Sequence, residues 1–111
     1  MKEFMKATYE TALSAGIDIV PVATAAKVMA ILYMWGNNEN FTCSPKFNVE
    51  REYIQKRYHL DGGETPDPLF VVAFKYYASY LENYAAEHKE DRVPKWAKEL
   101  IEERYGFKLI Y

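Results

Sequence analysis

The stretch from Asp67 to His88 constrains the fold more than any other part of this sequence, because it combines a helix start with a long helical pattern. Asp67 is suited to cap the free N–H groups of a first turn, and Pro68 suits the first helical position, where no N–H donor is needed. Aromatic and aliphatic residues then recur every three or four positions, which places them along one face of a helix. The members of this face are Phe70, Phe74, Tyr77, Leu81, Tyr84 and His88.

The apolar part of this predicted helix is wider than a single core requires. Leu69, Ala73, Tyr76 and Tyr80 extend it to one side. It then covers roughly 200° of the helix circumference, whereas a helix that lies on one core needs about 100°. The surplus is expected to lie against a second neighbour, which belongs either to this chain or to another molecule.

The rest of the chain also shows helical patterns, which are separated by glycine, proline and polar stretches. We expect further helices at residues 2 or 3–15, 21–35, 45 or 48–60, and 94–105. Residues 37–44 are predicted to form a polar loop, and the glycine-rich stretch 61–66 is predicted to form a turn. Residues 1–111 are thus expected to fold as a single helical domain, a compact all-α bundle of about five helices with little or no sheet.

Composition narrows the classes of protein to which the chain can belong. Its 14 basic and 16 acidic residues give a net charge of −2, which provides no general attraction to nucleic acid or to anionic membranes. Cys43 is the only cysteine, which fits a reducing compartment and predicts a cytoplasmic protein. Residues 1–6 have mixed charge and no apolar core, so we expect no signal peptide there. The apolar stretch 17–35 contains Pro21 and Lys27, which favours a buried helix over a membrane span.

Patterns typical of catalytic or metal sites are weak in this sequence. Cys43 precedes a predicted helix start, but nothing places His59 or His88 beside it as a base. The two histidines also lack the Glu-x-x-His spacing of metal centres in helical bundles. The acidic pairs, such as Glu50 with Glu52, are predicted to lie on exposed faces. We therefore expect no catalytic, cofactor-binding or metal-binding residues and no cofactor, and a small enzyme ranks third among the functions considered.

A nucleic-acid-binding regulator is the second functional class that the sequence supports. In the helix predicted at residues 50–59, the basic residues Arg51, Lys56 and Arg57 alternate with two tyrosines. Such a face is able to contact phosphate groups and to stack on bases. Two glutamates dilute its positive charge, and the predicted loop before it is longer than the turn of a helix-turn-helix motif.

Two segments in the second half of the chain read Tyr80-Leu81-x-x-Tyr84-Ala85-Ala86-Glu87-His88 and Val93-Pro94-Lys95-Trp96-Ala97. Together they resemble a helix–Pro–Trp–helix hinge found in some small bacterial proteins associated with toxin–antitoxin loci. The resemblance covers these two segments alone, and it implies an antitoxin-like protein.

Taken together, the patterns predict a small helical protein-binding module that acts by direct contact with another protein. The classes considered are a regulator, an inhibitor, an antitoxin-like protein and a phage-encoded accessory protein. The ten tyrosines fit this prediction, because tyrosine suits half-buried positions and interfaces. A homodimer through the same residues is the alternative. The predicted contact residues are Leu69, Tyr76, Tyr80, Phe107, Leu109 and Tyr111.

Overall fold

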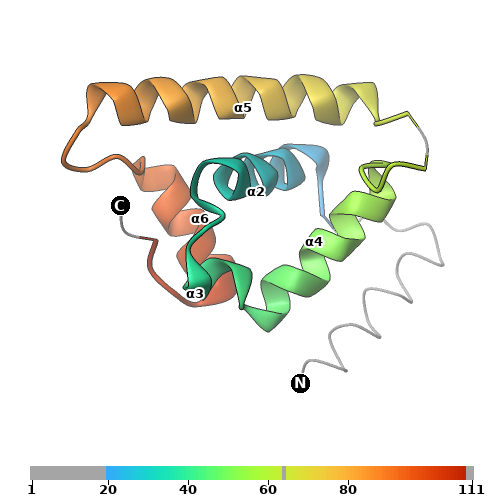
Figure 1. The fold of residues 1–111 in the computed structure, drawn as a ribbon, viewed down its shortest axis with the longest axis horizontal. Coiled ribbons are helices and arrows are strands. Elements are labelled where there is room, and N and C mark those ends of the chain that lie inside the picture. The colour runs from blue at the N-terminus through green and yellow to red at the C-terminus, as the bar shows by residue number, and fades with distance from the viewer. Residues whose placement is uncertain (1–19, 64, 110–111) are drawn as a thin grey trace.

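The computed structural model describes residues 20–63 and 65–109, and these residues form helices joined by short connections (Figure 1). No strand occurs among them, which confirms the predicted all-α class. The described helices are α2 (Val22–Trp35), α3 (Glu39–Thr42), α4 (Pro45–Arg57), α5 (Pro68–Glu87) and α6 (Lys95–Tyr105). The helix predicted before residue 16 lies outside the described residues. No helix in the described ranges is both long enough and apolar enough to cross a membrane.

Helix α2 lies at the centre of this arrangement. In the view of Figure 1, α5 crosses above α2, while α4, α3 and α6 lie below it. Both α5 and α6 contact α2, and its contact with α5 is the most extensive. Ala26 and Ala30 of α2 are fully buried, and such small side chains let neighbouring helices approach closely. One face of α5 is therefore held by α2.

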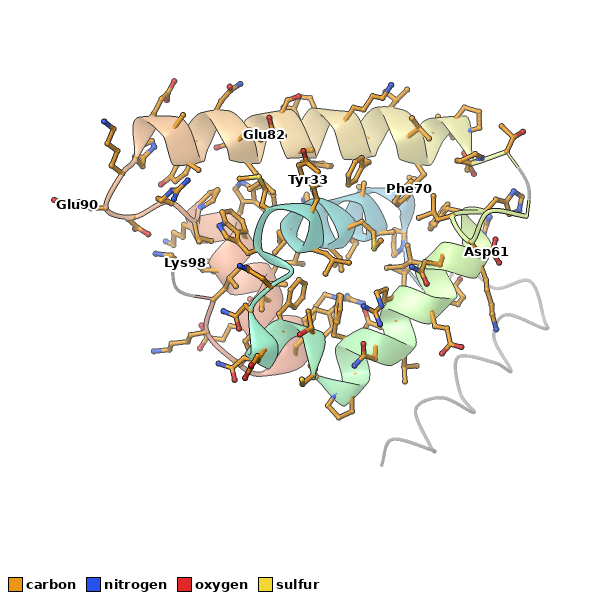
Figure 2. The ribbon with its side chains drawn as sticks, viewed as in Figure 1. Tyr33, Asp61, Phe70, Glu82, Glu90 and Lys98 are labelled. Carbon is orange, nitrogen blue, oxygen red and sulfur yellow. The ribbon has the colours of Figure 1, made fainter. Side chains whose placement is uncertain are left out.

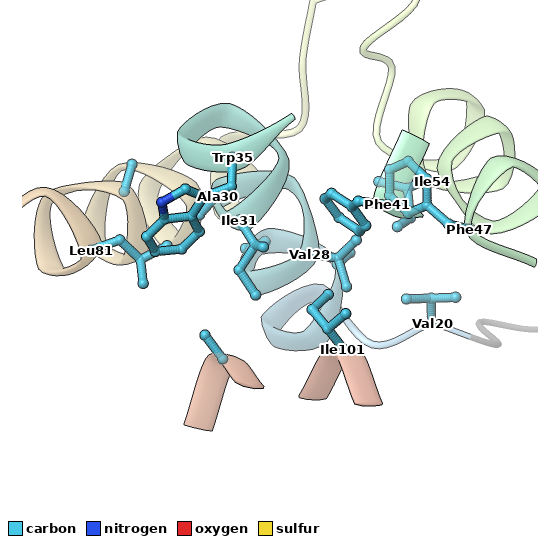
Figure 3. Packing of buried hydrophobic residues seen from close by; sticks show 14 of the residues in the cluster. Val20, Val28, Ala30, Ile31, Trp35, Phe41, Phe47, Ile54, Leu81 and Ile101 are labelled. Carbon is cyan, nitrogen blue, oxygen red and sulfur yellow. The ribbon is translucent and has the colours of Figure 1, made fainter. Parts of the chain in front are cut away.

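The hydrophobic core draws on all of the described helices (Figure 3). Each of them contributes at least one fully buried residue, for example Val28, Phe41, Ile54, Leu81 and Ile101. Aromatic rings fill the end of the core near α3, where the centroids of Phe41 and Phe47 lie 4.1 Å apart. The packing therefore joins residues that are distant in sequence.

Local signals in the sequence explain where several helices begin and end. The Ser44 side chain accepts a hydrogen bond from the backbone N–H three positions on, at 3.4 Å, so α4 begins at Pro45 and not at Asn48. The Asp67 side chain accepts a hydrogen bond from the N–H two positions on, at 2.9 Å. Gly106 ends α6 with a left-handed φ of 78°, a conformation that favours glycine. These predicted helix boundaries are confirmed.

Residues 36–44 differ in detail from the sequence prediction. Gly36 ends α2 with a right-handed φ of −68°, and glycine is needed there because a Cβ atom would clash with the carbonyl oxygen of Leu32. The stretch 37–44 is not only loop, because it contains the one-turn helix α3. The Asn38 side chain caps this helix by accepting a hydrogen bond from the Asn40 N–H at 2.9 Å.

Tyr58 anchors the connection between α4 and α5. Its hydroxyl donates a hydrogen bond to the carbonyl oxygen of Val20 at 2.7 Å. Its own carbonyl oxygen accepts a hydrogen bond from the N–H of Asp67 at 3.0 Å. The two ends of the glycine-rich connection are therefore held together, and the start of α5 is fixed relative to the start of α2.

Glu50 corrects one sequence prediction. We expected it on the exposed face of α4, but its side chain is fully buried. Its Oε2 atom accepts hydrogen bonds from the Nε of Arg104 at 3.1 Å and from the Nη2 of Arg104. It also accepts one from the Tyr105 hydroxyl at 3.2 Å. These three residues, which we call the Glu50 cluster, join α4 to α6.

The Glu50 cluster keeps its donors protonated. Burial raises the pKa of the Tyr105 phenol well above its ordinary value, and the charge of Glu50 raises it further. For Arg104, burial lowers the pKa, but the hydrogen bond and the charge of Glu50 outweigh this effect, and the pKa is raised overall. Both side chains therefore remain hydrogen-bond donors to Glu50 at neutral pH, which indicates a structural role for the cluster.

Candidate functional site

A row of apolar side chains on α5 is the most unusual feature of the described surface. Leu69, Val72, Tyr76 and Tyr80 are 72, 69, 66 and 42% exposed. Their spacing of three, four and four residues places them along one face of the helix, which we call the α5 stripe. Large apolar groups in water are unfavourable, and contiguous apolar patches mark binding surfaces in many proteins.

The opposite face of α5 holds the stripe in position. Phe70 lies on the side of α5 that faces the rest of the molecule (Figure 2), and its ring stacks on that of Tyr58 at 5.1 Å between centroids. Farther along the helix, Ala78, Leu81 and Ala85 are buried. Because this inner face packs in the core, the position of α5 is fixed and its stripe faces solvent.

A pocket adjoins the second half of the α5 stripe, where Tyr76 and Tyr80 belong to both. The other described residues that line it are Tyr77 of α5, Trp96 of α6 and Lys27 of α2, and its volume is about 290 Å³. The ring centroid of Trp96 lies 5.8 Å from that of Tyr77 and 5.9 Å from that of Tyr80. Helices α5 and α6 thus contribute the aromatic walls of one open hollow, which we call the α5–α6 pocket, and α2 contributes Lys27.

Lys27 brings a positive charge to the α5–α6 pocket. Its Nζ atom lies 5.4 Å from the ring centroid of Tyr77 and 5.7 Å from that of Trp96, which are cation–π distances. None of the ion pairs among the described residues involves Lys27. Lys27 is half-buried as a residue, and its ammonium group therefore faces aromatic rings without a carboxylate from the described part of the chain.

The structure separates the six predicted contact residues into groups. Leu69, Tyr76 and Tyr80 lie together on the exposed stripe. By contrast, Leu109 is only 1% exposed and belongs to the core, so it is not available to a partner in this conformation. Phe107 is half-buried and packs against the core. Tyr111 lies outside the described residues.

The basic residues of the nucleic-acid alternative lie on α4. Lys56 is exposed, whereas Arg51 and Arg57 are half-buried. Arg51 lies over the ring of Phe47, with 5.4 Å between its Cζ atom and the ring centroid.

The two tyrosines expected to stack on bases, Tyr53 and Tyr58, are buried at 4% and 2% exposure. Their rings are therefore not presented beside the α4 basic residues. Nucleic-acid binding stays a prediction based on the charged residues of α4 alone.

The side chains considered for catalysis lie on separate elements. Cys43 is an exposed thiol directly after α3, and His59 follows α4 with a left-handed φ of 60°. His88 stacks on Tyr84 at the end of α5, with 3.8 Å between ring centroids, and its Nδ1 atom lies 2.9 Å from the Tyr84 carbonyl oxygen. Among residues 20–63 and 65–109, no group of three potential metal ligands gathers.

Sequence reasoning missed three residues of this region, namely Val72, Lys27 and Trp96. Val72 follows Leu69 by three positions and precedes Tyr76 by four, so the helical spacing already placed it on the stripe. Lys27 is the only basic residue between positions 17 and 35, which was a signal that its charge needs a special environment. No local signal joined it to Trp96, because the two residues lie far apart in the sequence.

Comparison with known proteins gave no relatives. No family model matches the chain, and searches of the curated proteins and of the solved structures found no significant match.

Proposed function

We propose that this protein is a small protein-binding module that works by direct contact through the α5 stripe. The observation that carries the proposal is the exposure of Leu69, Val72, Tyr76 and Tyr80 on one face of a helix whose other face is held by the core. Aromatic and aliphatic side chains in such a row are typical anchors of protein interfaces. The proposal requires no cofactor and no catalytic residue.

The occupant that we propose is an amphipathic helix of another protein. The stripe repeats at three and four residues, which is the spacing at which two helices pack side by side. Recognition of an apolar helix face by an apolar groove or ridge is a common mode of peptide binding. Regulation, inhibition and antitoxin-like neutralisation in the cytoplasm are the biological settings that we propose for such binding, and a phage-encoded accessory protein is another.

The test is capture from a host lysate with two matched variants. Leu69→Ser/Tyr76→Ser removes two anchors of the stripe, while Tyr33→Ser removes an aromatic residue of similar exposure on α2. We expect a partner to be captured by the wild type and by Tyr33→Ser and to be lost with the stripe variant. The identified partner, once purified, should bind the stripe variant at least about tenfold more weakly, as for loss of interface anchors.

Other outcomes of the capture experiment, together with two further measurements, test the alternatives to binding through the α5 stripe. Equal capture by all three proteins would show that the α5 stripe is not the contact surface. Sedimentation of the purified proteins tests the homodimer alternative. If the chain forms a homodimer through the α5 stripe, the wild type and Tyr33→Ser should sediment as dimers and the stripe variant as a monomer. Nuclease treatment tests the nucleic-acid alternative, because nuclease releases a partner that is held through RNA or DNA.

A further inference from the structure

We propose that the α5–α6 pocket recognises a carboxylate side chain, an aspartate or glutamate, on the segment of the partner that lies along the α5 stripe. This inference rests on the proposed function and adds the chemistry of one contact. It is carried by Lys27, whose Nζ lies over the rings of Tyr77 and Trp96 and has no carboxylate partner among the described residues.

The described lining of the pocket has the chemistry of an anion site with aromatic walls. Every side chain in it carries a hydrogen-bond donor, namely the Lys27 ammonium, the Trp96 indole N–H and the three tyrosine hydroxyls. None carries a carboxylate. The lining therefore offers a carboxylate one cation and several neutral donor groups, and a bond between an ammonium and a carboxylate is stronger than one between neutral groups.

The same arrangement disfavours a cationic ligand. A cage of tyrosine and tryptophan rings attracts cations by itself, but here the chain's own Lys27 already occupies the faces of Tyr77 and Trp96. A second cation would be repelled by this ammonium group, and that repulsion excludes partner segments with the wrong charge.

The position of the pocket favours the carboxylate of a partner's side chain over the carboxylate at the C-terminus of a partner chain. Tyr76 and Tyr80 belong both to the pocket lining and to the stripe. A helix lying along the stripe therefore passes the open pocket and needs only to extend one acidic side chain into it. Its apolar residues meet the stripe, and its acidic residue meets Lys27.

The test uses three N-acetylated dipeptides as probes of the intact protein. Acetyl-phenylalanyl-glutamate with an amidated end has a carboxylate only on its side chain. Acetyl-phenylalanyl-glutamine amide has none, and acetyl-phenylalanyl-glutamine with a free end has one only at the C-terminus. Binding is followed at millimolar concentrations by the NMR shift of the Trp96 indole N–H.

We expect the glutamate amide to bind about tenfold more tightly than the glutamine amide, the ratio expected for one charge-assisted hydrogen bond. Lys27→Met should abolish this preference, and Lys27→Arg should restore most of it. The melting temperature of both variants provides the control for folding. Benzyltrimethylammonium should bind Lys27→Met more tightly than the wild type, because the aromatic faces are then free for a cation.

Three results with the dipeptides would overturn the proposal. These are no binding of the glutamate amide, equal binding of the glutamate and glutamine amides, and preference for the free-end peptide alone. The dipeptides need no natural partner, so their failure is separate from failure of the capture experiment. Loss of capture with Leu69→Ser/Tyr76→Ser but not with Lys27→Met would retain the α5 stripe and reject the pocket.

Discussion

The Glu50 cluster and the α5 stripe are opposite exceptions to the usual distribution of polar and apolar residues. In the cluster, a carboxylate is fully buried, and in the stripe, four large apolar side chains face solvent. The cluster is satisfied within the chain, because Arg104 and Tyr105 donate hydrogen bonds to Glu50. The stripe has no such compensation among the described residues.

The two exceptions have different physical causes. A buried charge must have its partners in the folded chain, since an unpaired one costs several kcal/mol, on the order of the whole stability of a small domain. An exposed apolar residue costs little stability, so folding alone neither requires nor forbids it. The cluster therefore belongs to the fold, while the stripe is better explained by binding.

The largest expected effect compares the same substitution on the two faces of α5. Leu81 is fully buried, whereas Leu69 is 72% exposed. Leu81→Ala should lower the free energy of unfolding by about 2–5 kcal/mol, because it leaves a cavity in the core. Leu69→Ala should change it by less than about 0.5 kcal/mol. Urea unfolding of both variants provides the measurement, and similar losses would show that the stripe contributes to stability.

Breaking the Glu50 cluster should have the next largest effect. Arg104→Met leaves the Glu50 carboxylate buried without its main partner and should cost about 3 kcal/mol, the lower part of the usual range. The lower part applies because the Arg104 side chain is itself 25% exposed. Urea unfolding at neutral pH measures this loss.

The double variant Glu50→Leu/Arg104→Met is the control for this prediction. It removes both charges together, and we expect it to be more stable than Arg104→Met alone, because apolar replacement of a buried ion pair is often tolerated. If Arg104→Met lowered the free energy of unfolding by less than about 1 kcal/mol, Arg104 would not be the partner that stabilises the buried Glu50 carboxylate.

The smallest expected effect is a dependence of stability on alkaline pH. The pKa of Tyr105 is raised in the folded chain by burial, whereas in the unfolded chain a tyrosine has a pKa of about 10. Its contribution is therefore fully present below pH 10 and is lost as the pH rises further, by up to about 1.4 kcal/mol per pH unit.

Tyr105→Phe should remove this part of the alkaline loss of stability. Urea unfolding on either side of pH 10 provides the measurement, with the exposed Tyr33→Phe as the matched control. The same alkaline slope in both variants would show that Tyr105 is not the group responsible.

Much of the helical architecture could be predicted because its signals are local. The caps at Ser44 and Asp67 and the glycine stop at Gly106 each depend on a few neighbouring residues. The wide apolar arc of α5 could also be read from helical spacing. These features follow from the geometry of one helix and need no knowledge of its neighbours.

Features that depend on distant pairs could not be predicted in the same way. Glu50 follows Phe47 by three positions and precedes Ile54 by four, so its spacing placed it on the buried face of α4. Its charge argued for exposure, and its partner Arg104 lies 54 residues away. The burial of Leu109 is likewise a tertiary effect, because a short apolar tail does not specify what it packs against.

The two tryptophans of the chain report on different regions of the molecule. Trp35 is 4% exposed within the core, whereas Trp96 lines the α5–α6 pocket beside Lys27. Indole fluorescence changes in wavelength and intensity with the polarity and the charges around the ring. Trp35→Phe therefore leaves an optical reporter of pocket occupancy, and Trp96→Phe leaves one of core integrity.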